Sequence, residues 1–176
     1  IGDWQNSLTL YSHDIHSPSN FILENAYGTA LIQDGQFEKA KYHVSLSIKE
    51  HPYAANLNNM AIIYTAEGNI AEAKHYLEQA TKKSKNFSVY ENYANFLLYY
   101  ESPEQTRIFA QKALNIFPKS AKLWLIFAQA EYLTGNKKNA LKAAEQAYQL
   151  QANPTSEEVL MIIKKNKPLI LSNYDL

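Results

Sequence analysis

Small residues recur through this chain at a nearly constant interval, and this recurrence constrains the fold more than any other feature. Ala40 and Ala73 are 33 residues apart, and Ala73 and Ala140 are 67 apart, which leaves room for one unit between them. Each of these alanines follows a glycine by five residues. A second series, with steps of 33 and 34 residues, consists of Ala80, Ala113 and Ala147. A fixed period of this length predicts an array of stacked structural repeats.

Each unit predicts two helices. The second unit carries an i, i+3, i+4, i+7 apolar face made of Leu57, Met60, Ala61 and Tyr64. A second stripe follows Gly68 and consists of Ile70, Ala73, Leu77 and Ala80. Gly68 suits the left-handed residue that ends a helix. Short helices are marginal alone, so the pairs are expected to bury their faces against one another.

The repeat register predicts a single all-α domain over residues 1–176. We expect an N-terminal helix or half repeat at 1–18, four helix pairs at 19–52, 53–86, 87–119 and 120–153, and a capping helix with a tail at 154–176. The third pair is degenerate, because Glu101 replaces the turn glycine and Thr106 replaces the alanine. Its second helix is still expected to begin there, with Ser102 as N-cap and Pro103 at the first helical position.

Both ends of the array carry their own signals. Residues 3–17 predict one helix, closed by Pro18. Residues 155–167 predict another, with Thr155 and Glu158 as a capping box and lysines at its C-terminal end. The tail at 169–176 is apolar for a free end, which indicates that it packs back on the array.

Composition excludes several classes of function. Lys+Arg and Asp+Glu each number 17, so the formal net charge is zero and no basic footprint for nucleic acid is expected. There is no cysteine and no apolar run long enough to span a bilayer. His13 and His16 are spaced i, i+3 but lack a third metal ligand. We therefore expect no metal, no cofactor and no catalytic residue.

The residues of the fourth unit match a named pattern. Trp124, Ala128, Gly135, Ala140 and Ala147 resemble the tetratricopeptide-repeat (TPR) signature W-x3-[GA]-x6-G-x4-A-x6-A. The first two units repeat it in register, and the third is a degenerate copy. The resemblance implies a right-handed α-α superhelix of about ten helices, whose concave groove is lined by the first helix of each repeat. Such domains are non-catalytic scaffolds that bind peptides or partner proteins.

The same resemblance places ten side chains in the groove. They are Asn25, Thr29, Asn58, Asn59, Ile62, Asn92, Asn95, Tyr99, Gln129 and Tyr132. Asparagine recurs among them, and its amide both donates and accepts hydrogen bonds, which suits an extended peptide backbone. Asn59 and Asn92 resemble the asparagine ladder in the tetratricopeptide arm of O-linked N-acetylglucosamine transferase. The alternative is that these amides bond neighbouring repeats or water.

Two further readings stay open from the sequence. The apolar tail favours a self-assembly module that stacks through its terminal helices. Residues 4–11 with Pro18-Ser19-Asn20 resemble the juncture before C-terminal tetratricopeptide repeats in polytopic membrane proteins of the protein mannosyltransferase type. The chain would then be the accessory domain of a membrane-bound glycosyltransferase. It begins with Ile1 and is expected to be part of a longer protein, as a soluble domain of unassigned location.

Overall fold

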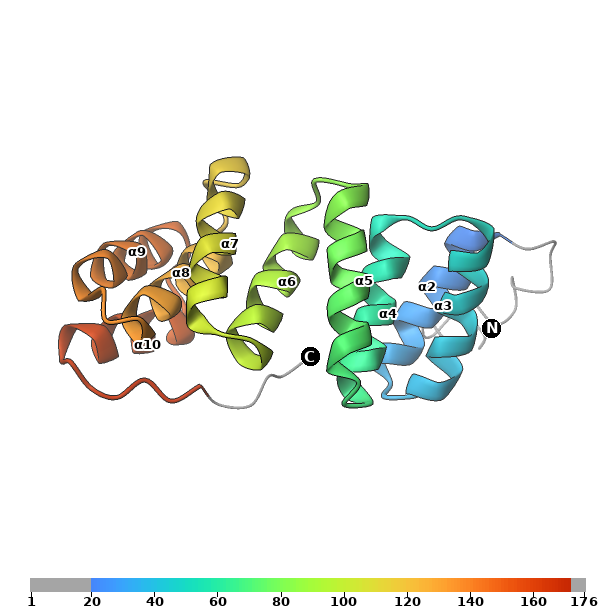
Figure 1. Ribbon diagram of the computed structural model, residues 1–176, viewed down its shortest axis with the longest axis horizontal. Helices are drawn as coiled ribbons and strands as arrows, with labels where there is room; N and C mark the ends of the chain where they lie inside the picture. Colours follow the sequence, from blue (N-terminus) through green and yellow to red (C-terminus); the bar gives the residue numbers. More distant parts are fainter. Residues whose placement is uncertain (1–19, 172–176) are drawn as a thin grey trace, which may run out of the picture. The chain divides into compact units, whose positions relative to one another are not determined.

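The computed structural model describes residues 20–171, which form two compact units at 20–89 and 90–171. Within these residues all regular structure is helical, as expected (Figure 1). The helices of the first unit are α2 (Phe21–Gln33), α3 (Phe37–Glu50), α4 (Ala54–Ala66) and α5 (Ile70–Lys83). Those of the second are α7 (Pro103–Ile116), α8 (Ala121–Leu133), α9 (Lys137–Leu150) and α10 (Pro154–Lys164). Helix α6 (Phe87–Tyr100) begins in the first unit and continues into the second.

Tight turns join the two helices of a pair. Gly35, Gly68 and Gly135 have φ angles of 72°, 74° and 85°, the left-handed conformation that glycine adopts at little cost. The third pair turns without glycine. There the Ser102 side chain accepts a hydrogen bond from the backbone N–H of Gln105, 3.2 Å away, and Pro103 is the first residue of α7. The N-cap predicted from the sequence is therefore confirmed.

The first unit is held together by small residues facing large ones. Ala40 and Val44 of α3 pack with Leu31 of α2 and with Met60 and Ile63 of α4. A second cluster joins Ala54, Leu57 and Ala80 to Val89 at the start of α6. These side chains are at most 7% exposed. The apolar stripes that the repeat register predicted are therefore the faces that form the core.

The core of the second unit is continuous across its helices. Its buried members include Ala94 and Leu98 of α6, Ala113 of α7, Phe127 of α8 and Ala144 of α9. Aromatic rings reinforce the third pair. Tyr90 of α6 stacks on Phe109 of α7 with ring centroids 5.7 Å apart. Helix α10 adds Val159, Leu160 and Ile163 to this core, at the place where the sequence predicts a capping helix.

At the chain ends, one predicted element lies outside the described residues and one predicted cap is wrong. The helix predicted at 3–17 lies outside the described residues. The predicted capping box of Thr155 and Glu158 is wrong, because α10 begins earlier, at Pro154. Asn153 is the N-cap and accepts from the Ser156 N–H at 2.9 Å, while the Ser156 hydroxyl accepts from the Asn153 N–H. Asparagine and serine satisfy the same reciprocal geometry that Thr and Glu would have supplied.

Candidate functional site

In the first unit, three of the predicted groove residues bond directly to one another. The Asn59 Nδ2 of α4 donates to the Asn25 Oδ1 of α2 at 2.9 Å and to the Thr29 Oγ1 at 2.8 Å. Thr29 in turn donates to the Asn25 carbonyl oxygen at 2.8 Å. Asn25 and Asn59 are each 8% exposed. The amides therefore join the first helices of successive pairs, which is the alternative role that the sequence left open.

This contact continues into a larger polar network that sequence reasoning missed. Asn56, which is fully buried, donates to the Ser47 hydroxyl at 2.9 Å and to the His51 carbonyl. Ser47 itself donates to the Phe21 carbonyl at 2.6 Å. Burial raises the pKa of the Tyr53 hydroxyl, and its hydrogen bonds with Ser47 and Asn25 oppose that shift. The sequence feature that could have indicated this network is the i, i+3 spacing of Asn56 and Asn59, which places both amides on one face of α4.

A histidine–glutamate contact and a lysine–glutamate ion pair flank this network. The His43 Nδ1 of α3 lies 2.8 Å from the Glu24 Oε2 of α2, and neither side chain is more than 17% exposed. Lys41 of α3 reaches the Glu67 carboxylate at 2.7 Å and stands 4.4 Å from the centre of the Tyr64 ring. The hydrogen bond to Glu67 raises the pKa of the Lys41 ammonium above its usual value. These contacts join neighbouring helices, and no sequence pattern predicted either of them.

The remaining first-unit candidates lie beside the network. Asn58 is 8% exposed and makes its own interactions, and Ile62 is half-buried. In the second unit Asn92, Asn95 and Tyr99 lie half-buried on α6, and Gln129 and Tyr132 lie half-buried on α8. The structure therefore brings Asn25, Thr29 and Asn59 into contact.

One set of candidates shares a register position. Each directly follows the small buried residue at which the helices approach closely, namely Gly28, Ala61, Ala94 or Ala128. The set consists of Thr29, Ile62, Asn95 and Gln129. Thr29 is committed to internal bonds, whereas Asn95 and Gln129 carry amides that are only half-buried. An amide in that state can still offer donors and an acceptor to a ligand.

Tyr132 has a partner from the chain itself. Its hydroxyl lies 2.8 Å from the carbonyl oxygen of Lys167 and 3.3 Å from the Asn166 Oδ1. Both belong to the segment that follows α10.

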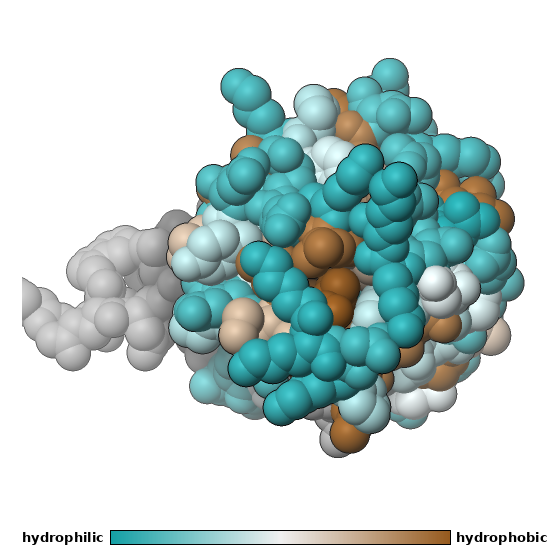
Figure 2. Space-filling model, turned by 90° about the vertical axis from the view of Figure 1, so that its left-hand side faces the viewer, coloured by the Kyte–Doolittle hydropathy of each residue, from teal (hydrophilic) through white to brown (hydrophobic). Residues whose placement is uncertain are grey.

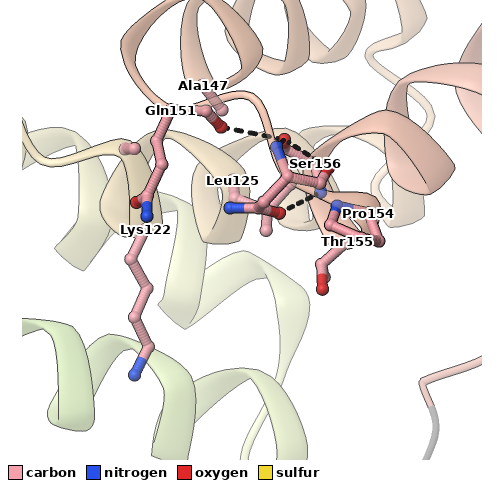
Figure 3. A pocket seen from close by; sticks show the side chains of 9 residues that line it. Lys122, Leu125, Ala147, Gln151, Pro154, Thr155 and Ser156 are labelled. Atoms are coloured by element: carbon pink, nitrogen blue, oxygen red, sulfur yellow. Dashed lines mark hydrogen bonds between the residues drawn. The ribbon is translucent and has the colours of Figure 1, made fainter.

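A hollow of about 360 Å³ lies between α8, α9 and the start of α10 (Figure 3). Its floor includes Leu125 and Ala147, and Lys122 stands at its edge. The polar atoms of Asn153 and Ser156 on its wall are used by the α10 cap. The hollow therefore offers apolar contact, the Lys122 cation and the polar side chains of Gln151 and Thr155.

Neither a metal centre nor a membrane span is found in the described part of the chain. Among residues 20–171 no three His, Cys, Asp or Glu side chains gather as metal ligands would. No helix in that range has the length and apolarity to cross a bilayer. His13 and His16 lie outside it.

The sequence matches no protein-family model and no curated protein. Solved structures are similar to it at low identity. MamA (residue 41 to the end) from Desulfovibrio magneticus RS-1 gives a TM-score of 0.69 at 16% identity, over 83% of this chain and 85% of that one. TTC0263, a TPR protein of Thermus thermophilus, gives 0.68 at 18%, over 84% and 82%. YrrB, described as a TPR protein with an unusual peptide-binding site, gives 0.69 at 12%, over 90% and 81%.

This chain has the tetratricopeptide-repeat fold. The expected all-α solenoid class is thereby confirmed for the part that the structure describes. A TPR fold positions the first helix of each pair beside the first helix of the next, as α2 and α4 are positioned here.

Proposed function

We propose that this TPR chain is a non-catalytic module that binds an extended segment of a partner protein along the first helices of its pairs. One observation carries the proposal: polar side chains recur at matching register positions of the first helices, with Thr29, Asn95 and Gln129 at one position and Asn59 and Asn92 at another. In the first unit, Asn59 of α4 donates to Asn25 and Thr29 of α2. A repeat of amides at this spacing matches the regular donors and acceptors of an extended backbone.

The hydrogen bonds inside the protein indicate which of these residues would be available to a ligand. Both Nδ2 hydrogens of Asn59 are used in hydrogen bonds inside the protein. Asn59 would therefore contact a ligand through its Oδ1, which can accept a hydrogen bond from a peptide N–H. Thr29 is engaged as donor and acceptor. The half-buried Asn95 and Gln129, both in the second unit, are therefore the stronger contact candidates.

The comparisons give independent support for a peptide ligand. YrrB, which shares the fold over most of both chains, is described as having a peptide-binding site. Neutral net charge and the amide-rich helix faces favour recognition of a backbone over recognition of a charged motif. No nucleic acid and no cofactor are proposed as ligands.

Selection from a displayed library of random peptides tests this function. A selected peptide would be labelled and titrated against the whole chain by fluorescence anisotropy. Asn95→Ala and Gln129→Ala are each expected to weaken binding about three- to tenfold, the loss of one hydrogen bond. Gln149→Ala, an exposed amide on the second helix α9, is the matched control and should change nothing. Equal effects of all three variants would contradict the groove assignment.

Self-association is a second candidate, favoured by the exposed apolar side chains of α9 and α10. Tyr148, Leu150 and Met161 are 37%, 38% and 41% exposed. Figure 2 shows the end of the second unit, where hydrophobic atoms lie in a small hollow within a mostly hydrophilic face. Light scattering over a range of concentrations tests this, with Met161→Ser as the variant expected to dissociate any oligomer. A monomer at every concentration would rule the candidate out.

The link to a membrane-bound glycosyltransferase stays a prediction. It rests on residues 4–11 and on Pro18-Ser19-Asn20, of which only Asn20 is described. Sequencing upstream of Ile1 is the test, since that region would have to encode several apolar spans of about 20 residues.

A further inference from the structure

The chain reverses direction at the end of α10. Asn166 has a φ angle of +51°, the left-handed region that asparagine tolerates better than most residues. The N–H groups of Asn166 and Lys167 donate to the carbonyls of Ile163 and Ile162 and close the helix. Pro168 cannot continue a helix and holds the preceding residue in extended conformation. Residues 167–171 therefore leave α10 as an extended segment (Figure 1).

This segment, residues 167–171, lies against α8. The Tyr132 hydroxyl donates to the Lys167 carbonyl oxygen at 2.8 Å, a side-chain-to-backbone bond of the kind that holds a peptide whatever its sequence. Leu171 packs against the buried core cluster of the second unit, as the partly buried Tyr132, Leu125 and Tyr99 also do. Two of those three residues, Tyr132 and Tyr99, are among the predicted groove residues.

Burial alternates along the segment. Leu169 and Leu171 are half-buried, whereas Ile170 between them is 83% exposed. A period of two is what an extended chain shows when one of its faces rests on a surface. The segment thus makes the two kinds of contact expected of a bound peptide, namely a backbone hydrogen bond and apolar anchors two residues apart.

We propose that residues 167–171 occupy, as an intramolecular ligand, the surface beside Tyr132 at which this chain binds partner peptides. The ligand class follows from the occupant: an extended segment with apolar side chains two residues apart, whose backbone carbonyl accepts from Tyr132. The inference rests on the proposed peptide-binding function and specifies its ligand and its control. A partner binds only by displacing the segment.

Because residues 167–171 are covalently attached to the chain, their binding to this surface is favoured over that of a free peptide. A short linker holds a segment at an effective concentration in the millimolar range. A ligand that needs the unoccupied surface has its apparent affinity reduced by the fraction of molecules in which that surface is open. If the segment is seated in about nine molecules of ten, an outside peptide binds about tenfold more weakly than it would to an open surface. Releasing the segment should therefore strengthen binding.

The test uses the whole chain and a labelled synthetic peptide of residues 165–171. The double variant Leu169→Ser/Leu171→Ser removes both anchors of the tethered segment. Anisotropy is expected to show that it binds the peptide about tenfold or more tighter than the unmodified chain does. Ile170→Ser is the matched control and should bind like the unmodified chain, because that side chain is exposed. Adding Tyr132→Phe to the double variant should weaken binding about three- to tenfold.

A second readout follows the segment directly. The chain has no cysteine, so Ile170→Cys accepts a single fluorophore. A library-selected peptide should increase the rotational freedom of that fluorophore as it displaces the segment. Unchanged freedom at saturating peptide would overturn the inference, as would equal affinity of the double variant and the unmodified chain.

The outcomes also separate this inference from the proposed function. Selected peptides that need Asn95 and Gln129 but do not compete with the 165–171 peptide would sustain the function and overturn this inference. Tyr132-dependent binding of the 165–171 peptide, with no foreign peptide selected, would sustain the seated segment and defeat the function. A concentration-dependent dimer that exchanges its segments would overturn an intramolecular occupant, since the segment would then be seated on a second copy.

Discussion

The Asn59 amide nitrogen lies 2.9 Å from the Asn25 amide oxygen and joins α4 to α2, the first helices of two successive pairs. The two residues are 34 positions apart in the chain and both are buried. The same nitrogen also donates to Thr29, so both of its hydrogens are used. An amide nitrogen with both hydrogens engaged between two repeats fixes their relative register, because sliding either helix breaks two bonds.

Asn59→Ala should destabilise the chain measurably. The substitution leaves the Asn25 Oδ1 buried without its donor, which costs about 1–3 kcal/mol. Urea unfolding monitored by circular dichroism measures the change in free energy. Gln33→Ala, which removes an exposed amide at the end of α2, is the control and should change stability by less than about 0.5 kcal/mol. If the two variants unfold alike, the contact contributes nothing to stability.

Gly28→Ala should also destabilise the chain, although alanine is the better helix former. A Cβ atom added at Gly28 would stand 2.5 Å from the Val44 Cγ2, and Val44 is fully buried. Overpacking of this kind costs about 1–3 kcal/mol, more than the ~1 kcal/mol that the helix gains. Val44→Ala in the same chain should restore part of the loss, and a double-mutant cycle measures that coupling. Strictly additive effects would show that the two positions do not clash.

The repeat period predicted much of this fold. It located the turn glycines, the core alanines and both helices of each pair, because a TPR-like period needs small residues wherever two helices approach closely. It also predicted the cap at Ser102 in the pair that lacks a turn glycine, because local chemistry alone determines that helix start. The start of α10 was predicted two residues late, at Thr155, although Asn153 followed by Pro154 is the same pattern of cap and proline that begins α7.

The partners of the groove residues could not be predicted from the sequence. The pattern assigns Asn59 and Tyr132 to a helix face, but it does not say what lies across from that face. Asn59 meets Asn25, which lies one repeat earlier, whereas Tyr132 meets the segment after α10. Both contacts depend on how helices stack and where the chain turns back, which are tertiary properties. The candidate amides therefore divide into those bonded inside the protein, such as Asn59, and those that we propose contact a ligand, such as Asn95 and Gln129.

Stability should fall above about pH 10, and Tyr76 should contribute to the fall. Burial raises the pKa of its hydroxyl above the ordinary 10.0. The folded chain thus holds this proton more tightly than the unfolded chain does. The stabilisation is complete below pH 10.0 and is lost as the pH rises toward the raised value.

Tyr76→Phe should therefore lose less stability than the unmodified chain does between neutral pH and about pH 11. Urea unfolding at a series of pH values measures this. Tyr42→Phe is the control, because Tyr42 is 62% exposed and should show the same alkaline loss as the unmodified chain. A Tyr76→Phe curve that runs parallel to the unmodified chain at all pH values would contradict the prediction.

Glu131 of α8 is a buried carboxylate at a position that is apolar in the other three pairs. It is 2% exposed, and its Oε2 has no hydrogen-bond partner among the described residues. The equivalent position, three residues after Gly28, Ala61 or Ala94, holds Leu31, Tyr64 or Leu97. Arg107 of α7 also has a buried, unpartnered Nε, and its Nη2 donates to the Glu104 carboxylate. Desolvation of the Glu131 charge is therefore incompletely compensated.

Glu131→Leu should for this reason stabilise the chain by about 1–3 kcal/mol at neutral pH. The leucine side chain removes the cost of desolvating the carboxylate, and leucine is the residue at the equivalent position of the first and third pairs. Leu133→Ala, an exposed position on the same helix, controls for general effects on α8. Glu131→Gln distinguishes charge from shape, since it keeps the volume and should recover part of the gain. Urea unfolding gives all three values. A stability loss in both Glu131 variants would show instead that the carboxylate makes a net favourable pair with Arg107 and that the charge holds α7 and α8 together.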